Sequence, residues 1–234
     1  MQLPSLVPGI LIKRYKRFLA DVELTDGSVT TVHCPNPGSM MGLKTAGLPV
    51  WLSTSTNPKR KLPMTLELVE ADGGLVAIHT GNPNKLAEEG LRNGTIAELS
   101  GFDTLRREVP YGANSRVDIV LETTGRTTFV EVKNCHLMRS PGLAEFPDSV
   151  TTRGAKHLND LMNERAKGHR AVMLFIIQRT DCTGFATAPD LDPVYHALLY
   201  EAAEAGVEIL CYDCHIDTTE IIVRGRIPWH RSKP

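Results

Sequence analysis

The 234 residues correspond to one large domain or two small ones, and their 41% hydrophobic and 23% charged content excludes collagen-like, coiled-coil and wholly disordered chains. The longest apolar run, residues 171–177, is too short to span a membrane, and 5 cysteines without a secretory signal predict a cytoplasmic protein lacking a disulfide framework. The net charge of −1 conceals a basic N-terminal module, because residues 1–61 hold eight basic and three acidic side chains whereas the remainder is acidic.

Residues 1–82 are expected to form a small β-barrel domain. Short β-prone runs alternate there with turns rich in glycine, proline and asparagine, which is typical of closely spaced strands. We expect strands over residues 10–24, 29–34, 50–53, 64–69 and 75–79. A barrel of this length has the dimensions of an OB fold. A β-meander without a binding role explains the same pattern equally well.

Residues 83–234 are expected to form a second domain, which begins after the turn sequence at residues 81–84. Residues 139–149 are predicted to be a loop. The continuous apolar run is typical of a strand buried on both faces. Strands that alternate with helices after a hairpin predict an α/β domain with a mixed sheet. We predict helices over residues 85–90, 95–99, 152–167 and 194–205, and strands over residues 117–121, 128–132, 171–177 and 207–212.

Three charged residues on the first two strands of this second domain form the strongest candidate site. Because side chains alternate along a strand, Glu131 and Lys133 project to one face while Val130 and Val132 point into the core. If the two strands pair as a hairpin, Asp118 lies beside them. Two buried carboxylates require a neutralising cation, and Mg²⁺ or Mn²⁺ suits a site with few carboxylate ligands. An ordinary ion pair at the end of a strand is the alternative.

The spacing of these residues matches the PD-(D/E)xK nuclease signature, with Val117 in place of the proline that gives the motif its name. A metal ion held by Asp118 and Glu131 would polarise a phosphodiester and acidify a water molecule, and Lys133 would assist catalysis by stabilising the developing charge. Glu98, in the preceding predicted helix, is a candidate third carboxylate of this catalytic group. A solvated position on the helix face is the alternative for Glu98.

Basic residues in both halves of the chain indicate contacts with nucleic acid. Strand alternation places Lys13, Tyr15 and Arg17 on one face of the first strand, and Arg14 and Lys16 on the other. OB surfaces bind single strands by combining basic grooves with aromatic side chains. Solvated surface charges are the alternative. Further candidates for phosphate contacts are Lys59, Arg60, Lys61, Arg116, Arg153, Lys156 and His157.

Short motifs in a fixed order carry a resemblance to a known family. They are residues 13–22, 33–40, 98–101, 116–118, 131–133, 146–148 and 153–158. Together they resemble the sugar fermentation stimulation protein A (SfsA) family. The resemblance implies an N-terminal OB-fold β-barrel, a C-terminal PD-(D/E)xK nuclease-like α/β domain, DNA binding and a regulatory link to sugar metabolism, especially of maltose. It also implies that Asp118, Glu131 and Lys133 match the nuclease-like core, with Glu98 as the additional acid.

Two functions from different classes are consistent with the sequence. The first is a DNA-binding protein that hydrolyses phosphodiester bonds with Mg²⁺ or Mn²⁺, acting on single- or double-stranded DNA, with RNA as a further partner. The second is a non-catalytic, largely non-specific DNA-binding regulator of sugar (maltose) metabolism genes. The two acids and the lysine favour catalysis, since a module that only binds gains nothing from carboxylates that repel phosphate.

Overall fold

Alternating buried and exposed residues build the N-terminal part of the chain as a closed sheet. The structure is a computed structural model that describes residues 1–112 and 115–231. The strands run in the order β3-β2-β1-β4-β5-β6, and a bridge between His33 and Thr65 joins β3 to β5, which confirms the predicted barrel. Its strands are β1 (Leu6–Tyr15), β2 (Leu19–Leu24), β3 (Val29–His33), β4 (Pro49–Thr54), β5 (Met64–Ala71) and β6 (Gly74–Ala77).

The prediction of a single strand over residues 10–24 is wrong. The chain reverses at Lys16 and Arg17, whose φ angles are 48° and 64°, so β1 and β2 form a hairpin. Tyr15 pairs with Leu19, so the loop of this hairpin has three residues, and the strand pairing on either side stabilises the positive φ angles of Lys16 and Arg17. Lys16 and Arg17 therefore lie in a turn, and the predicted strand faces hold only as far as Tyr15.

The second part of the chain is the predicted α/β domain with a mixed sheet, in the order β15-β14-β12-β9-β8-β7. The central β12 runs parallel to both of its neighbours, and the outer pairs are antiparallel. Its strands are β7 (Thr104–Tyr111), β8 (Ser115–Thr123), β9 (Arg126–Cys135), β12 (Arg170–Ile177), β14 (Glu208–Ile216) and β15 (Ile221–Arg226). Its helices are α1 (Pro83–Arg92), α2 (Thr152–Ala166) and α3 (Pro193–Glu204), with a 3₁₀ turn η1 (Ala97–Leu99).

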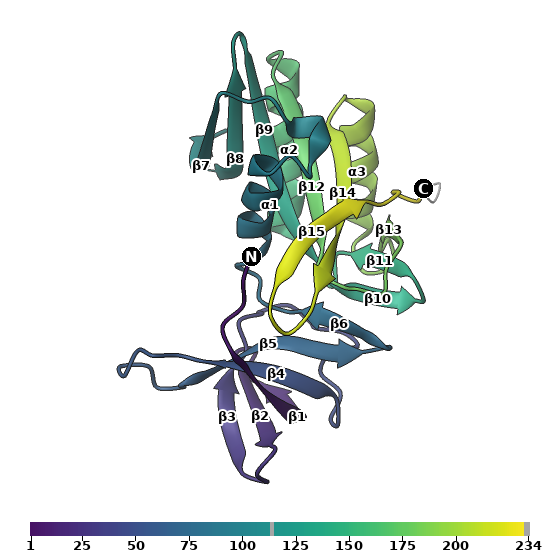
Figure 1. Ribbon diagram of the computed structural model, residues 1–234. Helices are drawn as coiled ribbons and strands as arrows, with labels where there is room; N and C mark the ends of the chain where they lie inside the picture. The colour runs from purple at the N-terminus through teal and green to yellow at the C-terminus, as the bar shows by residue number, and fades with distance from the viewer. Residues whose placement is uncertain (113–114, 232–234) are drawn as a thin grey trace.

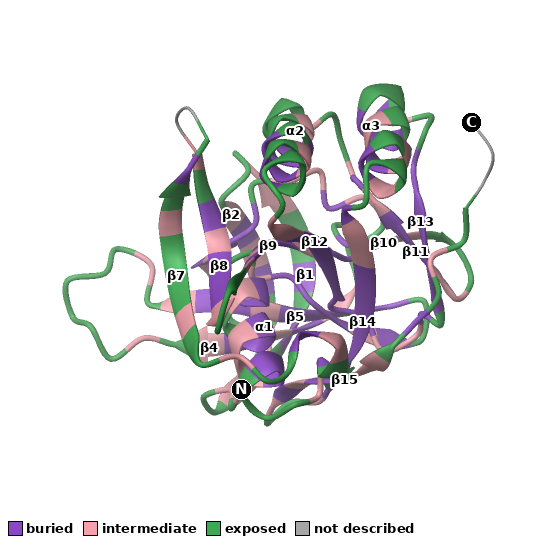
Figure 2. Ribbon diagram, turned by 90° about the horizontal axis from the view of Figure 1, so that it is seen from above, coloured by how far each residue is buried: buried purple, intermediate pink, exposed green. Residues whose placement is uncertain are grey.

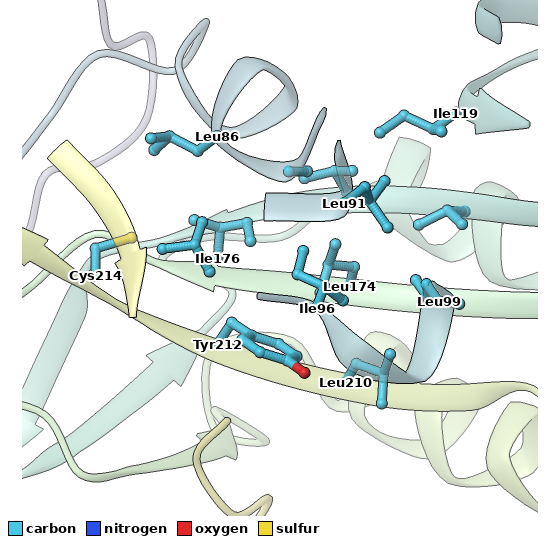
Figure 3. Close-up of a cluster of buried hydrophobic side chains, with 14 of the residues drawn as sticks. Leu86, Leu91, Ile96, Leu99, Ile119, Leu174, Ile176, Leu210, Tyr212 and Cys214 are labelled. Carbon is cyan, nitrogen blue, oxygen red and sulfur yellow. The ribbon is translucent and has the colours of Figure 1, made fainter. Parts of the chain in front are cut away.

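The helices cover both faces of this sheet, with α1 on one side and α2 and α3 on the other (Figures 1 and 2). Even-numbered side chains from Val172 to Ile176 pack toward α1, and odd-numbered ones from Met173 to Ile177 pack toward α2 and α3. Figure 3 shows the first of these clusters, in which Leu86 and Leu91 lie with Leu174, Ile176 and Leu210. The apolar run of β12 is therefore buried on both faces, as predicted.

The segment predicted as a loop over residues 139–149 contains part of a second, three-stranded sheet. Its strands are β10 (Leu137–Ser140), β11 (Leu143–Phe146) and β13 (Gly184–Thr187), in the order β10-β11-β13. β11 is too short to stand out by periodicity, and its pairing partner β13 lies far along the chain. A strand that depends on such a distant partner leaves little local signal.

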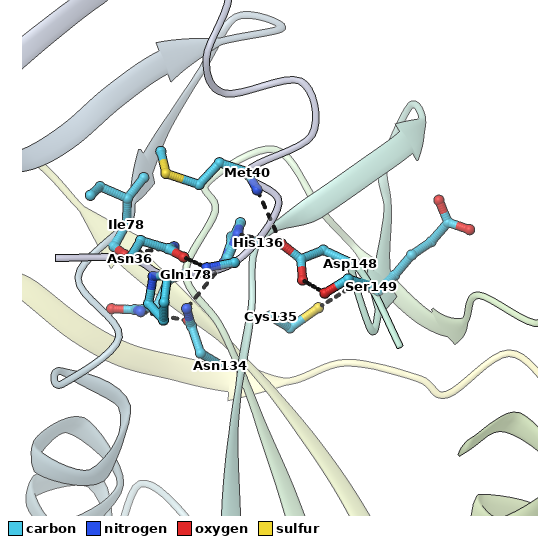
Figure 4. Close-up of polar contacts among 12 residues, drawn as sticks. Asn36, Met40, Ile78, Asn134, Cys135, His136, Asp148, Ser149 and Gln178 are labelled. Atoms are coloured by element: carbon cyan, nitrogen blue, oxygen red, sulfur yellow. Dashed lines mark hydrogen bonds and ion pairs between the residues drawn. The ribbon is translucent and has the colours of Figure 1, made fainter. Parts of the chain in front are cut away.

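The two domains meet through polar contacts (Figure 4) and through the apolar cluster beside α1, to which Leu68 and Ala77 of the barrel belong. The backbone N–H of Met40 donates to Asp148 Oδ2 at 3.2 Å, and the N–H of Ala77 donates to the carbonyl of Gln178 at 3.0 Å. Asp148 also lies 3.7 Å from Nε2 of the buried His136. These contacts tie the loop after β3 and the end of β6 to the second domain.

Arg179 reinforces this interface from a position that is only 1% exposed. Its guanidinium donates to Asp181 at 2.9 and 2.7 Å within its own domain. It also donates to the carbonyl of His136 at 3.1 Å and to Asp72, in the turn between β5 and β6, at 3.1 Å. One buried side chain therefore links both domains.

The first residues of the chain belong spatially to the second domain. The N–H of Leu3 donates to the carbonyl of Thr219 at 2.7 Å, and Gln2 forms a bridge with Glu220 just before β15. Met1 and Leu3 pack against the apolar cluster beside α1. Among the described residues, no helix is both long enough and apolar enough to cross a membrane.

Candidate active site

Asp118 lies where β8 and β9 part. The two strands pair from Ile119 with Val130 to the turn at their far end. Beyond that pair, Asp118 Oδ2 accepts a hydrogen bond from the backbone N–H of Val132 at 2.8 Å. Asn84, in the first turn of α1, donates to Asp118 Oδ1 at 2.8 Å. The carboxylate of β8 is thus held against β9 by the backbone on one side and by an amide on the other.

Glu131 is the most deeply buried member of the site, with 1% of its surface exposed. Its neighbours Val130 and Val132 belong to the apolar cluster on the α1 side, so Glu131 faces α2, as strand alternation predicts. Lys133 Nζ donates to Glu131 Oε1 at 2.7 Å, and Nδ1 of His157 on α2 contacts the same oxygen. Glu131 Oε2 is buried and has no hydrogen-bond partner among the described residues.

The two carboxylates have opposite pKa shifts. Burial and the neighbouring charge of Glu131 raise the pKa of Asp118. Burial also acts to raise the pKa of Glu131, but hydrogen bonds and charges from His157 and Lys133 outweigh it and lower that pKa. The rise at Asp118 reflects repulsion between two acids in a poorly hydrated space.

A divalent cation fits this donor set. The unpartnered Oε2 of Glu131 offers a free ligand atom, and positive charge between the acids would relieve the repulsion that raises the pKa of Asp118. Mg²⁺ typically binds one or two protein carboxylates and completes its shell with water and substrate oxygens. Asp118 and Glu131 are therefore the residues that would hold such an ion.

A pocket of about 570 Å³ opens beside these residues. It is lined by the end of β7, the start of β8 and the first turns of α2. It brings together four predicted phosphate-binding residues on its walls, which are Arg116, Arg153, Lys156 and His157. The first three are exposed, whereas His157 is 4% exposed and accepts a hydrogen bond from Arg153 Nε at 3.3 Å. The contact between His157 and Glu131 was not predicted, because nothing in the sequence indicates the angle at which α2 crosses β9.

Glu98 does not join Asp118 and Glu131. Its carboxylate contacts the hydroxyl of Tyr212 and accepts a hydrogen bond from Arg226 at 2.8 Å. Tyr212 lies in the cluster on the α1 side of the sheet, whereas Glu131 faces α2. The predicted helix over residues 95–99 is only the 3₁₀ turn η1. The ion pair with Arg226 holds Glu98 beside β15. The prediction of a third carboxylate from Glu98 therefore has no support in this geometry.

Two residues that sequence reasoning missed complete the surroundings of the site. Asn84 orients Asp118, and its only sequence signal is its place directly after the proline that opens α1. Tyr111, at the end of β7, is buried, and its hydroxyl has no hydrogen-bond partner among the described residues. Burial raises the pKa of Tyr111, and the nearby charges of Glu131 and Asp160 raise it further.

The basic residues predicted on the barrel divide into separate groups. Lys13 forms an ion pair with Asp21 at 3.3 Å and lies over the ring of Tyr15, whose hydroxyl also donates to Asp21. Arg14 Nη2 donates to the carbonyls of Arg17, Asn36 and Gly38 at 2.7–2.9 Å, so it holds the loop after β3 in place. The third group, Lys59, Arg60 and Lys61, lies in the exposed β4–β5 loop, where Arg60 Nη2 donates to Thr65 at 3.0 Å.

Another group of metal-type ligands lies far from this site. Among the described residues, His215, Asp217 and Glu220 are the only three whose ligand atoms fall within 4.8 Å of one another. Asp217 Oδ1 already accepts hydrogen bonds from the backbone of Thr219 and Glu220, so it stabilises the turn before β15. The turn explains this cluster without an ion.

The chain matches known proteins over nearly its whole length. Residues 12–78 match the model of the SfsA N-terminal OB domain, and residues 81–220 match that of the sugar fermentation stimulation protein RE domain. A sugar fermentation stimulation protein homolog from Maricaulis maris is 56% identical and covers 95% of this chain and 96% of its own. A homolog from Rhodospirillum centenum is 55% identical, covering 92% and 93%.

A solved structure has the same fold. It is described as the structure of Pyrococcus furiosus SfsA in complex with Ca²⁺, and it superposes with a TM-score of 0.89 at 28% identity. The match covers 99% of this chain and 98% of the other. The predicted order of an OB barrel followed by a nuclease-like α/β domain is confirmed by these similarities.

Proposed function

Since the chain belongs to the sugar fermentation stimulation protein family, we propose that it binds nucleic acid and hydrolyses phosphodiester bonds in a metal-dependent reaction. The observation that carries this proposal is the group of Asp118, Glu131 and Lys133 beside a pocket whose rim is cationic. The Ca²⁺ complex of the Pyrococcus furiosus relative supports a cation site, because Ca²⁺ and Mg²⁺ both prefer oxygen ligands.

In this proposal Asp118 and Glu131 are the residues that would hold Mg²⁺ or Mn²⁺. The ion would supply Lewis acidity, which polarises a phosphoryl oxygen and lowers the pKa of water. Asn84 and the N–H of Val132 fix the carboxylate of Asp118 before any ligand arrives. Lys133 and His157 hold one oxygen of Glu131 and leave the other for the ion.

Lys133 has a second role in the proposed reaction. A water molecule attacks phosphorus and the bond from phosphorus to one ester oxygen breaks, giving a phosphate monoester and a free hydroxyl. The proton lost by the water is balanced by the one gained at the leaving oxygen. Negative charge grows on the phosphoryl oxygens in the transition state, and the ammonium of Lys133 stabilises it.

The barrel is proposed to supply affinity for the substrate. The β1–β2 turn and the β4–β5 loop both carry exposed cations, which favour binding to phosphates of any sequence. We further propose a cytoplasmic location, which the 5 free and buried cysteines support.

Cleavage assays test this function directly. Purified protein is incubated with single- and double-stranded DNA and with RNA, in Mg²⁺, Mn²⁺ or EDTA. We expect metal-dependent cleavage that falls by about 10²–10³-fold in Asp118→Asn and Lys133→Ala. Glu122→Gln, a half-buried acid on the same strand as Asp118, and Lys44→Ala, an exposed lysine on the barrel, are the controls and should keep full activity.

One outcome would favour the non-catalytic alternative. Salt-sensitive binding of DNA without cleavage of any substrate, unchanged in Asp118→Asn and Lys133→Ala, contradicts the proposed hydrolysis. The protein would then be a DNA-binding regulator, as the family name's reference to sugar fermentation suggests.

A further inference from the structure

The pocket beside Glu131 has two firmly connected walls. One wall is the β7–β8 end, with Pro110, Ser115 and Arg116, and the other is the start of α2. Ser115 Oγ donates to Asp160 Oδ2 of α2 at 2.6 Å, which ties the two walls together. Gly112 approaches Asp160 so closely that an added Cβ would lie 2.8 Å from its Oδ1. The spacing between the walls is therefore set by direct contacts.

The acids and Lys133 lie behind the lining of this pocket, because His157, which lines it, contacts Glu131. The side chain of Lys133 is 14% exposed and that of Glu131 1% exposed. A volume of about 570 Å³ is that of a site for a single drug-sized ligand, which is also the size of a nucleotide.

A double helix cannot readily bring a phosphodiester to such a position. Its backbones follow the surface of a stiff rod, and smooth bending over a few base pairs is costly. A single strand lacks this stiffness, so it has the flexibility to enter the pocket and place one phosphate beside His157 and the buried acids.

The β1–β2 turn has the features of a surface that binds single strands of nucleic acid. Phe18, in the β1–β2 turn, is 47% exposed and follows the exposed Lys16 and Arg17. Exposed aromatic rings beside cations bind unpaired bases by stacking.

Hydrogen bonds fix the β1–β2 turn relative to the start of α2, which lines the pocket. The N–H of Cys34 donates to the carbonyl of Phe18 at 2.8 Å, and Arg17 Nε donates to the carbonyl of Pro37 at 3.1 Å. The same loop reaches Asp148 through the N–H of Met40, and α2 begins a few residues beyond Asp148. The turn, the loop and the start of α2 thus form one connected surface.

We propose that the substrate at this site is a single strand of nucleic acid, bound first at the β1–β2 turn and then in the pocket between the β7–β8 end and the first turns of α2. This inference rests on the proposed phosphodiester hydrolysis. Double-stranded nucleic acid still binds to the cationic surface, but its phosphates do not reach Glu131. The cations at the rim, Arg116 and Arg153 among them, then contact the phosphates of the entering strand.

The test compares substrates of one sequence, which are a single strand, a blunt duplex and a duplex with a single-stranded overhang. In Mg²⁺ or Mn²⁺, we expect cleavage of the single strand and of the overhang, and cleavage of the blunt duplex that is slower by about 100-fold, the cost of unstacking. Phe18→Ala should raise KM for the single strand about tenfold while leaving kcat nearly unchanged. Val29→Ala, which removes another exposed apolar side chain of the barrel, is the matched control.

The outcomes distinguish this inference from the proposed function. Cleavage of the blunt duplex at a rate within tenfold of the single strand overturns the single-strand inference and leaves hydrolysis intact. Equal KM values for wild type and Phe18→Ala overturn the role of the turn. No cleavage of any of the substrates, with any of the metals, overturns the proposed function itself.

Discussion

Removal of the buried guanidinium of Arg179 tests how much the ion pair beside the domain interface stabilises the fold. Arg179→Met keeps an unbranched side chain of similar length and removes the charge and every hydrogen-bond donor. Asp181, whose side chain is 16% exposed, then loses both of its bonds to the guanidinium. The carbonyl of His136 loses its donor as well, and Asp72 of the barrel loses its ion-pair partner.

The magnitude follows from the exposure of the partners. Breaking a buried, hydrogen-bonded ion pair by removing one member costs about 3–5 kcal/mol, because the other charge stays behind without compensation. The contact with Asp72 adds little, since that side chain is 53% exposed and such pairs contribute about 0–1 kcal/mol. We therefore expect Arg179→Met to lower the free energy of unfolding by about 3–5 kcal/mol.

Urea unfolding, followed by circular dichroism and by tryptophan fluorescence, measures this loss. Asp72→Asn is the matched control, because it removes only the exposed partner, and it should cost less than about 1 kcal/mol. The reasoning is refuted if Arg179→Met unfolds within 1 kcal/mol of wild type, or if both variants lose the same amount. Either result would mean that the buried pair with Asp181 does not stabilise the fold as argued.

Three further predictions concern the acids and the domain interface. Asp118→Asn removes the repulsion with Glu131 and should raise the free energy of unfolding of the metal-free protein by about 1 kcal/mol in urea. Mg²⁺ at 100 times its Kd should raise the free energy of unfolding of wild type by about 2.7 kcal/mol and leave that of the variant unchanged. Gly38→Ala places a Cβ 2.8 Å from Asp148 Oδ2 and should cost about 1–3 kcal/mol, whereas Gly225→Ala, whose nearest contact is 3.8 Å, should cost less in the same assay. Burial acts to raise the pKa of Asp148, but the imidazole of His136, 3.7 Å away, and the hydrogen bond from the backbone N–H of Met40 lower it below its usual 3.8. A carboxyl group whose pKa is lowered in the folded state stabilises the fold at pH values above its pKa in the unfolded state. This contribution disappears as the pH falls through the folded-state pKa. The stability lost in Asp148→Asn should thus be constant at about pH 5–7 and vanish in strong acid.

Patterns within one segment predicted most of the fold. The apolar run of residues 171–177 indicated a strand covered on both faces, and the structure places it at the centre of the sheet between α1 and the other two helices. Alternation along β9 likewise predicted that Glu131 and Lys133 share a face. Both inferences succeeded because the signal depends only on neighbours a few positions away.

Features that depend on distant partners could not be predicted. The turn at Lys16 and Arg17 contains neither glycine nor proline, so nothing in that basic run marks the reversal that the pairing of β1 with β2 imposes. Glu98 is held by Arg226, which is 128 positions away in the sequence. His157 reaches Glu131 only because α2 packs across β9. In each case the position of a side chain depends on a contact between elements that the sequence keeps far apart.

The placement of the first residues beside β15 has a consequence for how the chain folds. The barrel is connected to the second domain both through residues 3–6 and through residues 77–83, so it cannot swing about one flexible linker. Gln2 and Glu220, which are 218 positions apart, can pair only after β15 has been synthesised. Contacts of such long sequence separation form slowly. We therefore expect the barrel to fold early and this pairing to complete the native structure last, so the N-terminal segment stays exposed to proteases until synthesis ends.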